Sequence, residues 1–152
     1  MAGLGIIYSR AYIEISNCCN RHCDFCPGTS RKAEFMSAVF FSKVISEVAP
    51  VVDNIYLHVL GEPLWHPDFP ELIELCGAHR VRVNITTNGD LLDTPNGRKL
   101  LHPTVKKINF SLHAQRPEAD LEKVLKFAQN AQVLNPGLNI DLRLWNGGDD
   151  NR

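Results

Sequence analysis

Three cysteines within eight residues are the feature that most constrains this chain. Cys19 and Cys23 are separated by three residues, Cys23 and Cys26 by two, and Pro27 and Gly28 follow at once. Thiolates are soft ligands, and closely spaced cysteines let one loop surround a metal centre. Three protein ligands leave one iron of a four-iron cluster open, and a catalytic metal requires an open position. The spacing therefore favours a reactive iron–sulfur centre.

Zinc is the main alternative that this spacing leaves open, because short cysteine pairs commonly bind zinc. A tetrahedral zinc site takes four protein ligands, and the chain has only two further cysteines, Cys18 and Cys76. Cys18 adjoins Cys19 and would bind the same ion only with strain, so we interpret it as a structural or incidental thiol. His22, inside the loop, is the remaining candidate for a fourth zinc ligand. A fortuitous cluster or a disulfide is the third alternative.

The composition is that of one globular domain. The chain has 152 residues, of which 44% are hydrophobic and 22% charged, values typical of a domain with its own core. The formal net charge of −1 gives no bulk attraction to nucleic acid or membranes, and no apolar run reaches the roughly 20 residues that span a bilayer. The start of the chain does not match a signal peptide, and five cysteines suit a reducing compartment. We therefore expect a cytoplasmic protein without nucleic-acid or membrane partners.

Strand-like and helix-like segments alternate along the chain. Alternating or continuous apolar runs predict strands, and apolar residues at helical spacing predict helices. Such alternation predicts a parallel α/β sheet joined by right-handed crossovers. The apolar run 54–60 favours a sheet buried on both faces, and the pattern of 138–145 favours a half-covered edge. The expected strands cover 11–16, 54–60, 81–86, 106–112 and 138–145, and the expected helices 37–49, 68–78, 94–101 and 117–134.

Four motifs follow four successive expected strands. A glycine such as Gly61 lets a ligand approach the main chain, and Glu62 can accept hydrogen bonds from an ammonium group. In parallel sheets ligands bind outside the carboxyl ends of the strands, so all four motifs would lie on one rim. Each tripeptide alone is a common turn, but their shared position predicts a ligand site. The motifs are the cysteine loop, Gly61-Glu62-Pro63, Thr87-Asn88-Gly89 and Ser111-Leu112-His113.

With these motifs in this order, the chain resembles the radical SAM superfamily. The loop matches the superfamily's Cys-x3-Cys-x-aromatic-Cys signature, with Phe25 as the aromatic residue. The resemblance covers residues 11–146, between a lead-in at 1–10 and a polar tail at 147–152. It implies a partial (β/α) barrel of about five parallel strands, truncated relative to the usual six-unit core. The chain looks like members that carry a SPASM-type C-terminal extension, which is absent here.

The resemblance implies a metal site and a chemistry. Cys19, Cys23 and Cys26 would hold a [4Fe–4S] cluster, whose fourth iron binds the amino and carboxylate groups of S-adenosylmethionine. Reductive cleavage of this cofactor gives a 5′-deoxyadenosyl radical, which abstracts hydrogen from a substrate. Extended members of the superfamily often modify peptides or proteins, so we expect a peptide or protein as the otherwise unknown substrate. A reducing partner such as flavodoxin or ferredoxin would supply the electron.

The resemblance also implies where S-adenosylmethionine would bind. Leu60 occupies the first glycine position of the superfamily's Gly-Gly-Glu-type motif, so we expect altered but retained binding of the methionine amino group. Arg143 suits a bidentate contact with the methionine carboxylate, and a solvated strand residue is an equal alternative. The expected cofactor-binding residues are Phe25 near the adenine, Gly61 and Glu62 at the amino group, Asn88 and Ser111 at the ribose or carboxylate, and Arg143.

Two other functions remain open from the sequence. One is a non-catalytic iron–sulfur or zinc-binding module built on the same cysteines. The other is an inactive fragment of a longer enzyme, and we expect a fragment because the chain stops soon after its fifth expected strand. Three histidines are secondary candidates: His58 as a buried or a pocket residue, and His66 and His113 as substrate contacts at the rim. Cys76 is expected in the core.

Overall fold

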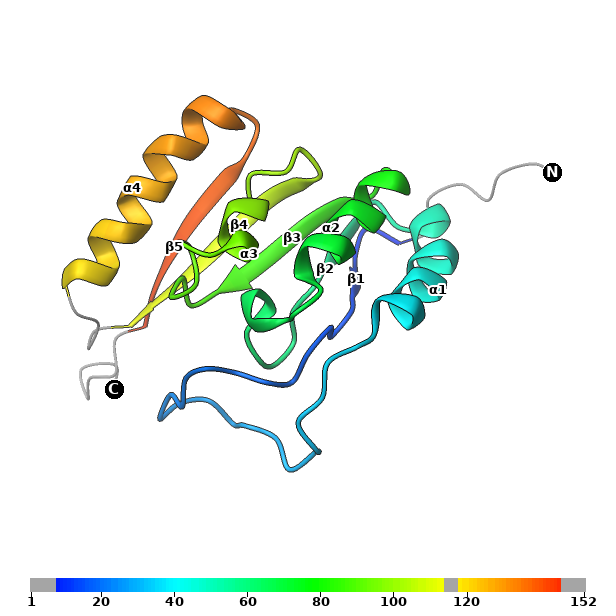
Figure 1. Ribbon diagram of the computed structural model, residues 1–152, viewed down its shortest axis with the longest axis horizontal. Helices are drawn as coiled ribbons and strands as arrows, with labels where there is room; N and C mark the ends of the chain where they lie inside the picture. Colours follow the sequence, from blue (N-terminus) through cyan, green and yellow to red (C-terminus); the bar gives the residue numbers. More distant parts are fainter. Residues whose placement is uncertain (1–7, 114–117, 146–152) are drawn as a thin grey trace.

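Five parallel strands form one sheet in the order β1-β2-β3-β4-β5. The computed structural model describes residues 8–113 and 118–145 of the chain. The strands follow the sequence from one edge of the sheet to the other (Figure 1), and each crossover contains a helix. The parallel α/β sheet predicted from the alternating segments is confirmed.

The strands occupy the predicted segments, but the first two are shorter than expected. Beyond β1 the chain turns to a returning segment, where Met36 N donates to Ile15 O. Beyond β2 the amide of Thr86 donates to the side chain of His58 in place of a main-chain carbonyl. The turn beyond β1 and the His58 bond beyond β2 each end the regular main-chain hydrogen bonding of the strand earlier than predicted. The strands are β1 (Ala11–Tyr12), β2 (Asn54–Tyr56), β3 (Arg82–Thr87), β4 (Val105–His113) and β5 (Asn139–Trp145).

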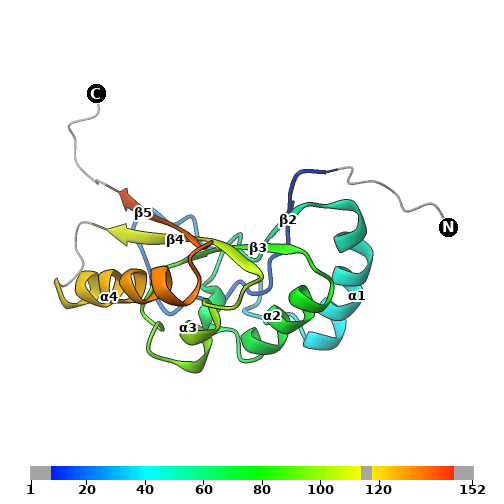
Figure 2. The same ribbon diagram turned by 90° about the horizontal axis from the view of Figure 1, so that it is seen from above.

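Four α-helices lie on one side of the sheet (Figure 2). The first is capped by Ser37, whose side chain accepts a hydrogen bond from Phe40 N, and it runs into a 3₁₀ turn at Pro50. A proline fixes φ and lacks the amide that a continuing helix needs. The helices are α1 (Ala38–Val48), α2 (Phe69–Ala78), α3 (Pro95–Lys99) and α4 (Glu118–Leu134), with the 3₁₀ helices η1 (Ala49–Val51) and η2 (Pro63–Trp65).

The core fills the space between the sheet and the helices. Strand side chains that point to the helices are apolar and buried, among them Ile55, Val83 and Ile108, and removing this surface from water stabilises the fold. The opposite side of the sheet, which we call the inner face, carries polar and aromatic side chains. The prediction that both faces of the sheet bury apolar residues is therefore wrong for the inner face. Inner-face residues include Tyr12, Tyr56, His58, Asn84, Thr86, Lys107, Asn109, Ser111, Asp141 and Arg143.

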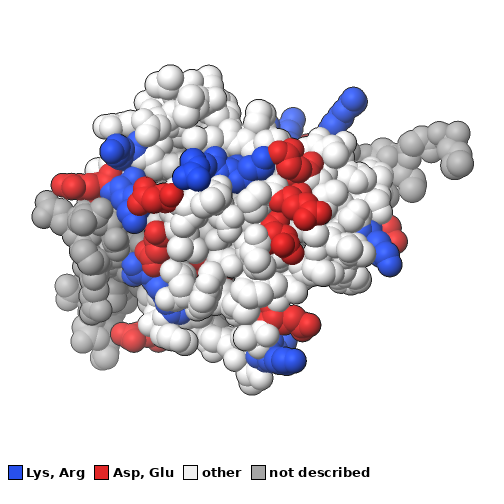
Figure 3. Space-filling model, in the orientation of Figure 1, with Lys and Arg blue, Asp and Glu red and all other residues white. Residues whose placement is uncertain are grey.

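Strand β5 forms one edge of the sheet and is only partly covered. Ile140 packs against the core, whereas Leu142 and Leu144 are exposed, which confirms the predicted half-covered edge. On the face drawn in Figure 3, acidic and basic side chains are both spread over the surface, in keeping with the net charge of −1. Within the described ranges, no helix combines the length and apolarity that crossing a membrane requires.

Candidate functional site

The cysteine segment, residues 17–36, lies beyond the carboxyl ends of the strands (Figure 1). Its two ends are tied together where Glu34 N donates to Asn17 Oδ1 at 2.8 Å. The segment between them forms one wall of a cavity of about 520 Å³, and Leu60 and Trp65 contribute to another wall. The same cavity is lined by all three predicted metal ligands, Cys19, Cys23 and Cys26.

The donor set of this cavity fits an iron–sulfur cluster. Three soft thiol ligands surround one space, as a cluster requires. Within the part of the chain that the structure describes, no three His, Cys, Asp or Glu side chains are grouped as ligands of one metal ion. Burial raises the pKa of the Cys19 thiol, so metal binding there would release a proton.

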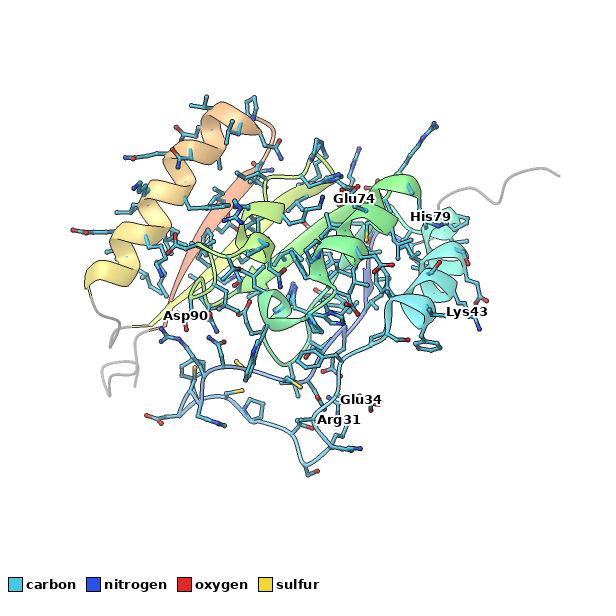
Figure 4. The ribbon with its side chains drawn as sticks, in the orientation of Figure 1. Arg31, Glu34, Lys43, Glu74, His79 and Asp90 are labelled. Atoms are coloured by element: carbon cyan, nitrogen blue, oxygen red, sulfur yellow. The ribbon has the colours of Figure 1, made fainter. Side chains whose placement is uncertain are left out.

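Arg21 holds the cysteine loop against the end of β3. Its guanidinium makes two hydrogen bonds to Asp90, with Nε–Oδ2 and Nη2–Oδ1 distances of 2.6 and 2.7 Å. Asn20 also donates to Asp90, and Asn88 donates to Asn20 Oδ1. Figure 4 labels Asp90 where the chain after β3 meets the loop. The sequence analysis did not predict this contact, because Arg21 and Asp90 lie 69 residues apart. The only indication in the sequence was an arginine between two cysteines of the loop.

Glu62 joins the motif after β2 to the motif after β3. Its side chain is buried, with 2% of its surface exposed. Its carboxylate accepts hydrogen bonds from Leu64 N at 3.0 Å, from Thr87 Oγ1 at 2.7 Å and from Asn88 N at 2.7 Å. Burial raises the pKa of this carboxyl group, and the three hydrogen bonds oppose that effect. Glu62 thus gives the two predicted motifs a fixed relative position.

Gly61 allows the turn after β2 to pack against the cysteine segment. It has a φ of +76°, and a Cβ atom at this position would lie 2.6 Å from Ser16 O and 2.7 Å from Cys18 O. The next residue, Glu62, donates its amide to Cys18 O at 2.7 Å. The structure therefore gives this glycine a packing role, in addition to the close ligand approach that the sequence predicts.

The structure shows the burial and contacts of several residues that the sequence left as secondary candidates. The Cys18 thiol donates to a main-chain carbonyl of the returning segment at 3.7 Å. Cys76 is fully buried, and burial raises its pKa to about 12, which confirms its place in the core. His66 is also fully buried, and its two ring nitrogens bond main-chain groups. His66 therefore lies in the core, and the secondary possibility that it contacts a substrate at the rim is not supported. The side chain of His113 lies outside the described residues.

The remaining predicted cofactor residues lie in the cysteine loop and at the carboxyl ends of β3, β4 and β5. Phe25 is in the loop and 45% exposed. Asn88 is nearly buried and contacts the loop through Asn20. Ser111 and Arg143 are register partners on β4 and β5, so they are neighbours on the inner face. The structure thus joins Asn88 to the cysteine loop and sets Ser111 beside Arg143.

Comparison with known proteins identifies the family. A model of the radical SAM superfamily matches residues 13–135, most of the chain. The chain belongs to the radical SAM superfamily. The resemblance stated from the motifs is thereby confirmed, and the cofactors of this superfamily are a [4Fe–4S] cluster and S-adenosylmethionine.

Curated relatives of this radical SAM chain are longer proteins. It is 30% identical over 127 residues to the tungsten-containing aldehyde ferredoxin oxidoreductase cofactor-modifying protein of Pyrococcus furiosus, covering 81% of this chain and 33% of that protein. It is 28% identical over 118 residues to the Fe-coproporphyrin III synthase of Methanosarcina barkeri, covering 76% of this chain and 30% of that protein. The chain therefore spans about a third of the length of these relatives.

Solved structures share the fold of the chain. Streptococcus suis SuiB, bound to S-adenosylmethionine, matches with a TM-score of 0.72 and 18% identity, covering 90% of this chain and 33% of that one. BtrN, in complex with AdoMet and 2-DOIA, matches with a TM-score of 0.59 and 24% identity, covering 79% of this chain and 56% of that one. These matches confirm the predicted partial (β/α) barrel.

Proposed function

We propose that this radical SAM chain is the core of an enzyme that binds a [4Fe–4S] cluster through Cys19, Cys23 and Cys26. When bound, the cluster and S-adenosylmethionine together supply one-electron cleavage of a carbon–sulfur bond, which leads to hydrogen abstraction from a substrate. The observation that carries the proposal is the single cavity that the three cysteines line at the carboxyl edge of the sheet. Membership of the superfamily supports it.

The protein's own contribution is to fix the loop and to exclude water. The bidentate pair between Arg21 and Asp90 sets both the position and the direction of the loop, because charge-assisted fork contacts are strongly directional. Leu60 and Trp65 add apolar surface to the cavity. A water-poor cavity protects a reactive centre from side reactions.

In this proposal S-adenosylmethionine binds along the carboxyl ends of β2 to β5. The Glu62 carboxylate accepts three hydrogen bonds from the protein, and a carboxylate can accept about four. One acceptor position therefore remains for the methionine ammonium group. Arg143, beside Ser111 in the sheet, pairs with the methionine carboxylate. Further contacts come from Phe25 at the adenine and from Gly61 and Asn88 around the methionine.

For the substrate we propose a peptide or protein. A solved structure of this fold, Streptococcus suis SuiB bound to precursor peptide SuiA, supports this choice. For the electron donor we propose a small reducing protein such as flavodoxin or ferredoxin. For the location we propose the cytoplasm, where five cysteines without a disulfide are the expected state of such a chain.

The test is anaerobic reconstitution with iron and sulfide, followed by reduction and an assay for 5′-deoxyadenosine. We expect about four irons per chain and formation of 5′-deoxyadenosine. Cys23→Ala should lose both. Cys18→Ala is the matched control, because this neighbouring thiol bonds the returning segment, and it should keep both. A wild-type chain that binds iron but forms no 5′-deoxyadenosine would support a non-catalytic module instead.

A further inference from the structure

The inner face carries a chain of hydrogen bonds across β2, β3 and β4. Thr86 N donates to His58 Nδ1 at 3.1 Å, and His58 Nε2 lies 3.0 Å from Thr86 Oγ1. Asn109 Nδ2 donates to the same Thr86 oxygen at 3.3 Å and to Ile85 O at 3.5 Å. A polar chain of this kind is costly to bury unless its groups are satisfied, so an unsatisfied group in it indicates where a further polar partner would fit.

The protonation state of His58 follows from its contacts. Because Nδ1 accepts the Thr86 amide, the ring proton is on Nε2, and Nε2 donates to Thr86 Oγ1. Burial and the positive charge of Arg143 lower the pKa of His58 to about 4, so the ring is neutral at pH 7. The Thr86 oxygen then accepts two hydrogen bonds, and its own hydrogen remains available to a ligand.

Asn109 supplies a hydrogen-bond acceptor next to the Thr86 donor. Its side chain is 1% exposed, and Oδ1 is the one buried side-chain nitrogen or oxygen without a partner among the described residues. An unsatisfied buried acceptor costs roughly 1–3 kcal/mol, and native structures rarely keep one without a reason. Thr86 and Asn109 therefore offer one donor and one acceptor side by side.

Two ion pairs lie near Thr86 and Asn109. Lys107 and Asp141 form an ion pair at 2.5 Å, and so do Arg31 and Glu14. Arg143 adds a positive charge that reaches His58, which disfavours a cation here, and the lone pairs of Asn109 Oδ1 would repel an anion. A neutral group with both a hydrogen-bond acceptor and a donor matches what Thr86 and Asn109 offer.

Aromatic rings border the same level. The rings of Tyr12 and Tyr56 are stacked with centroids 4.7 Å apart, and the ring of His58 stands edge-on to Tyr56 at 5.7 Å. Packed rings hold His58, and through it Thr86, in one orientation. Thr86 and Asn109 also lie one inner-face position before Ser111 and Arg143 along the strands, so this level is next to the proposed cofactor contacts.

We propose that Thr86 and Asn109 form a substrate subsite that binds a neutral amide group, with the Thr86 hydroxyl donating to the amide oxygen and Asn109 Oδ1 accepting from the amide nitrogen. The proposal rests on the proposed function, because the occupant would be the substrate of that reaction. It narrows the substrate to molecules that carry an amide near the reacting position, such as a peptide.

The test uses three probes of the same planar shape: acetamide, acetate and acetamidinium. The ¹⁵N-labelled chain is reconstituted with its cluster and titrated with each probe, and the NMR signal of the Thr86 amide is followed. Acetamide should bind at least about fivefold more tightly than either ion, since only acetamide can both donate and accept here. Equal binding of all three probes, or binding of none, would overturn the subsite.

Single substitutions test the contributions of Asn109 and Thr86 separately. Asn109→Leu should weaken acetamide binding about fivefold, the effect of one hydrogen bond, whereas Thr86→Ser keeps the hydroxyl and should retain it. Ser46→Ala removes an exposed hydroxyl on α1 and is the control for a change away from the inner face. Circular dichroism checks that each variant folds. If wild type forms 5′-deoxyadenosine but shows no acetamide preference, the subsite fails and the proposed function stands; if it forms none, the proposed function fails.

Discussion

His58 takes the place of a main-chain carbonyl in the sheet. It accepts the Thr86 amide, which in a continued ladder would bond the backbone of β2. Burial, assisted by the charge of Arg143, lowers its pKa to about 4. A single side chain thus ends β2 early and orders the inner face, and it does so only while the ring is neutral.

The lowered pKa of His58 makes the stability of the fold depend on pH. Between its ordinary pKa and about 4, the unfolded chain binds a proton that folded His58 does not bind, so stability rises with pH and falls on acidification. We expect a loss of about 2 kcal/mol between pH 7 and pH 5 from this residue. Urea unfolding at both pH values measures it in wild type and in His58→Gln. Equal pH dependence in the two proteins would contradict the assignment.

The sequence predicted which residues lie at the site. It did not predict which hydrogen bonds these residues make. Glu62 was expected to face an ammonium group, and the structure shows three protein donors on its carboxylate. Two of these donors, Thr87 and Asn88, lie about 25 residues away. A local motif does not encode such contacts, because they depend on which strand ends become neighbours.

At the scale of elements, the site depends on the close packing of the turn after β2 against the cysteine segment. Gly61→Ala should lower the free energy of unfolding by at least about 2 kcal/mol, because it adds a clash with two main-chain oxygens to a positive φ. Gly28→Ala is the matched control. Gly28 also has a positive φ, but nothing lies within 4 Å of an added Cβ, so the cost should be about 1 kcal/mol. Equal losses in urea unfolding would refute the packing role of Gly61.

The cysteine loop is a second element with a specific anchor. Asp90→Ala removes the bidentate partner of Arg21, and we expect a loss of about 1–2 kcal/mol with faster amide exchange in residues 19–26. Asp53→Ala removes the more exposed pair with Arg82 and should cost less than about 0.5 kcal/mol. Hydrogen exchange followed by mass spectrometry measures the local effect. Unchanged exchange in the loop after Asp90→Ala would show that other contacts hold it.

At the scale of the whole molecule, the fold was predictable because its signals are periodic. Apolar runs at strand spacing and apolar residues at helical spacing recur often enough to locate each of the five strands and four helices. The polar inner face was not predicted, because the run 54–60 reads as apolar on both sides while Tyr56 and His58 alternate with the buried Ile55 and Leu57. Aromatic and imidazole side chains suit either environment, so the pattern alone did not distinguish the faces.

In the proposed function, the cavity at the carboxyl edge holds a cluster that binds S-adenosylmethionine. Electron paramagnetic resonance of the reduced, reconstituted chain, recorded with and without S-adenosylmethionine, measures whether the cofactor binds the cluster. We predict a four-iron signal that shifts when the cofactor is added, because the cluster keeps one iron without a protein ligand. A signal that the cofactor leaves unchanged, or a chain that holds no cluster, would contradict this binding.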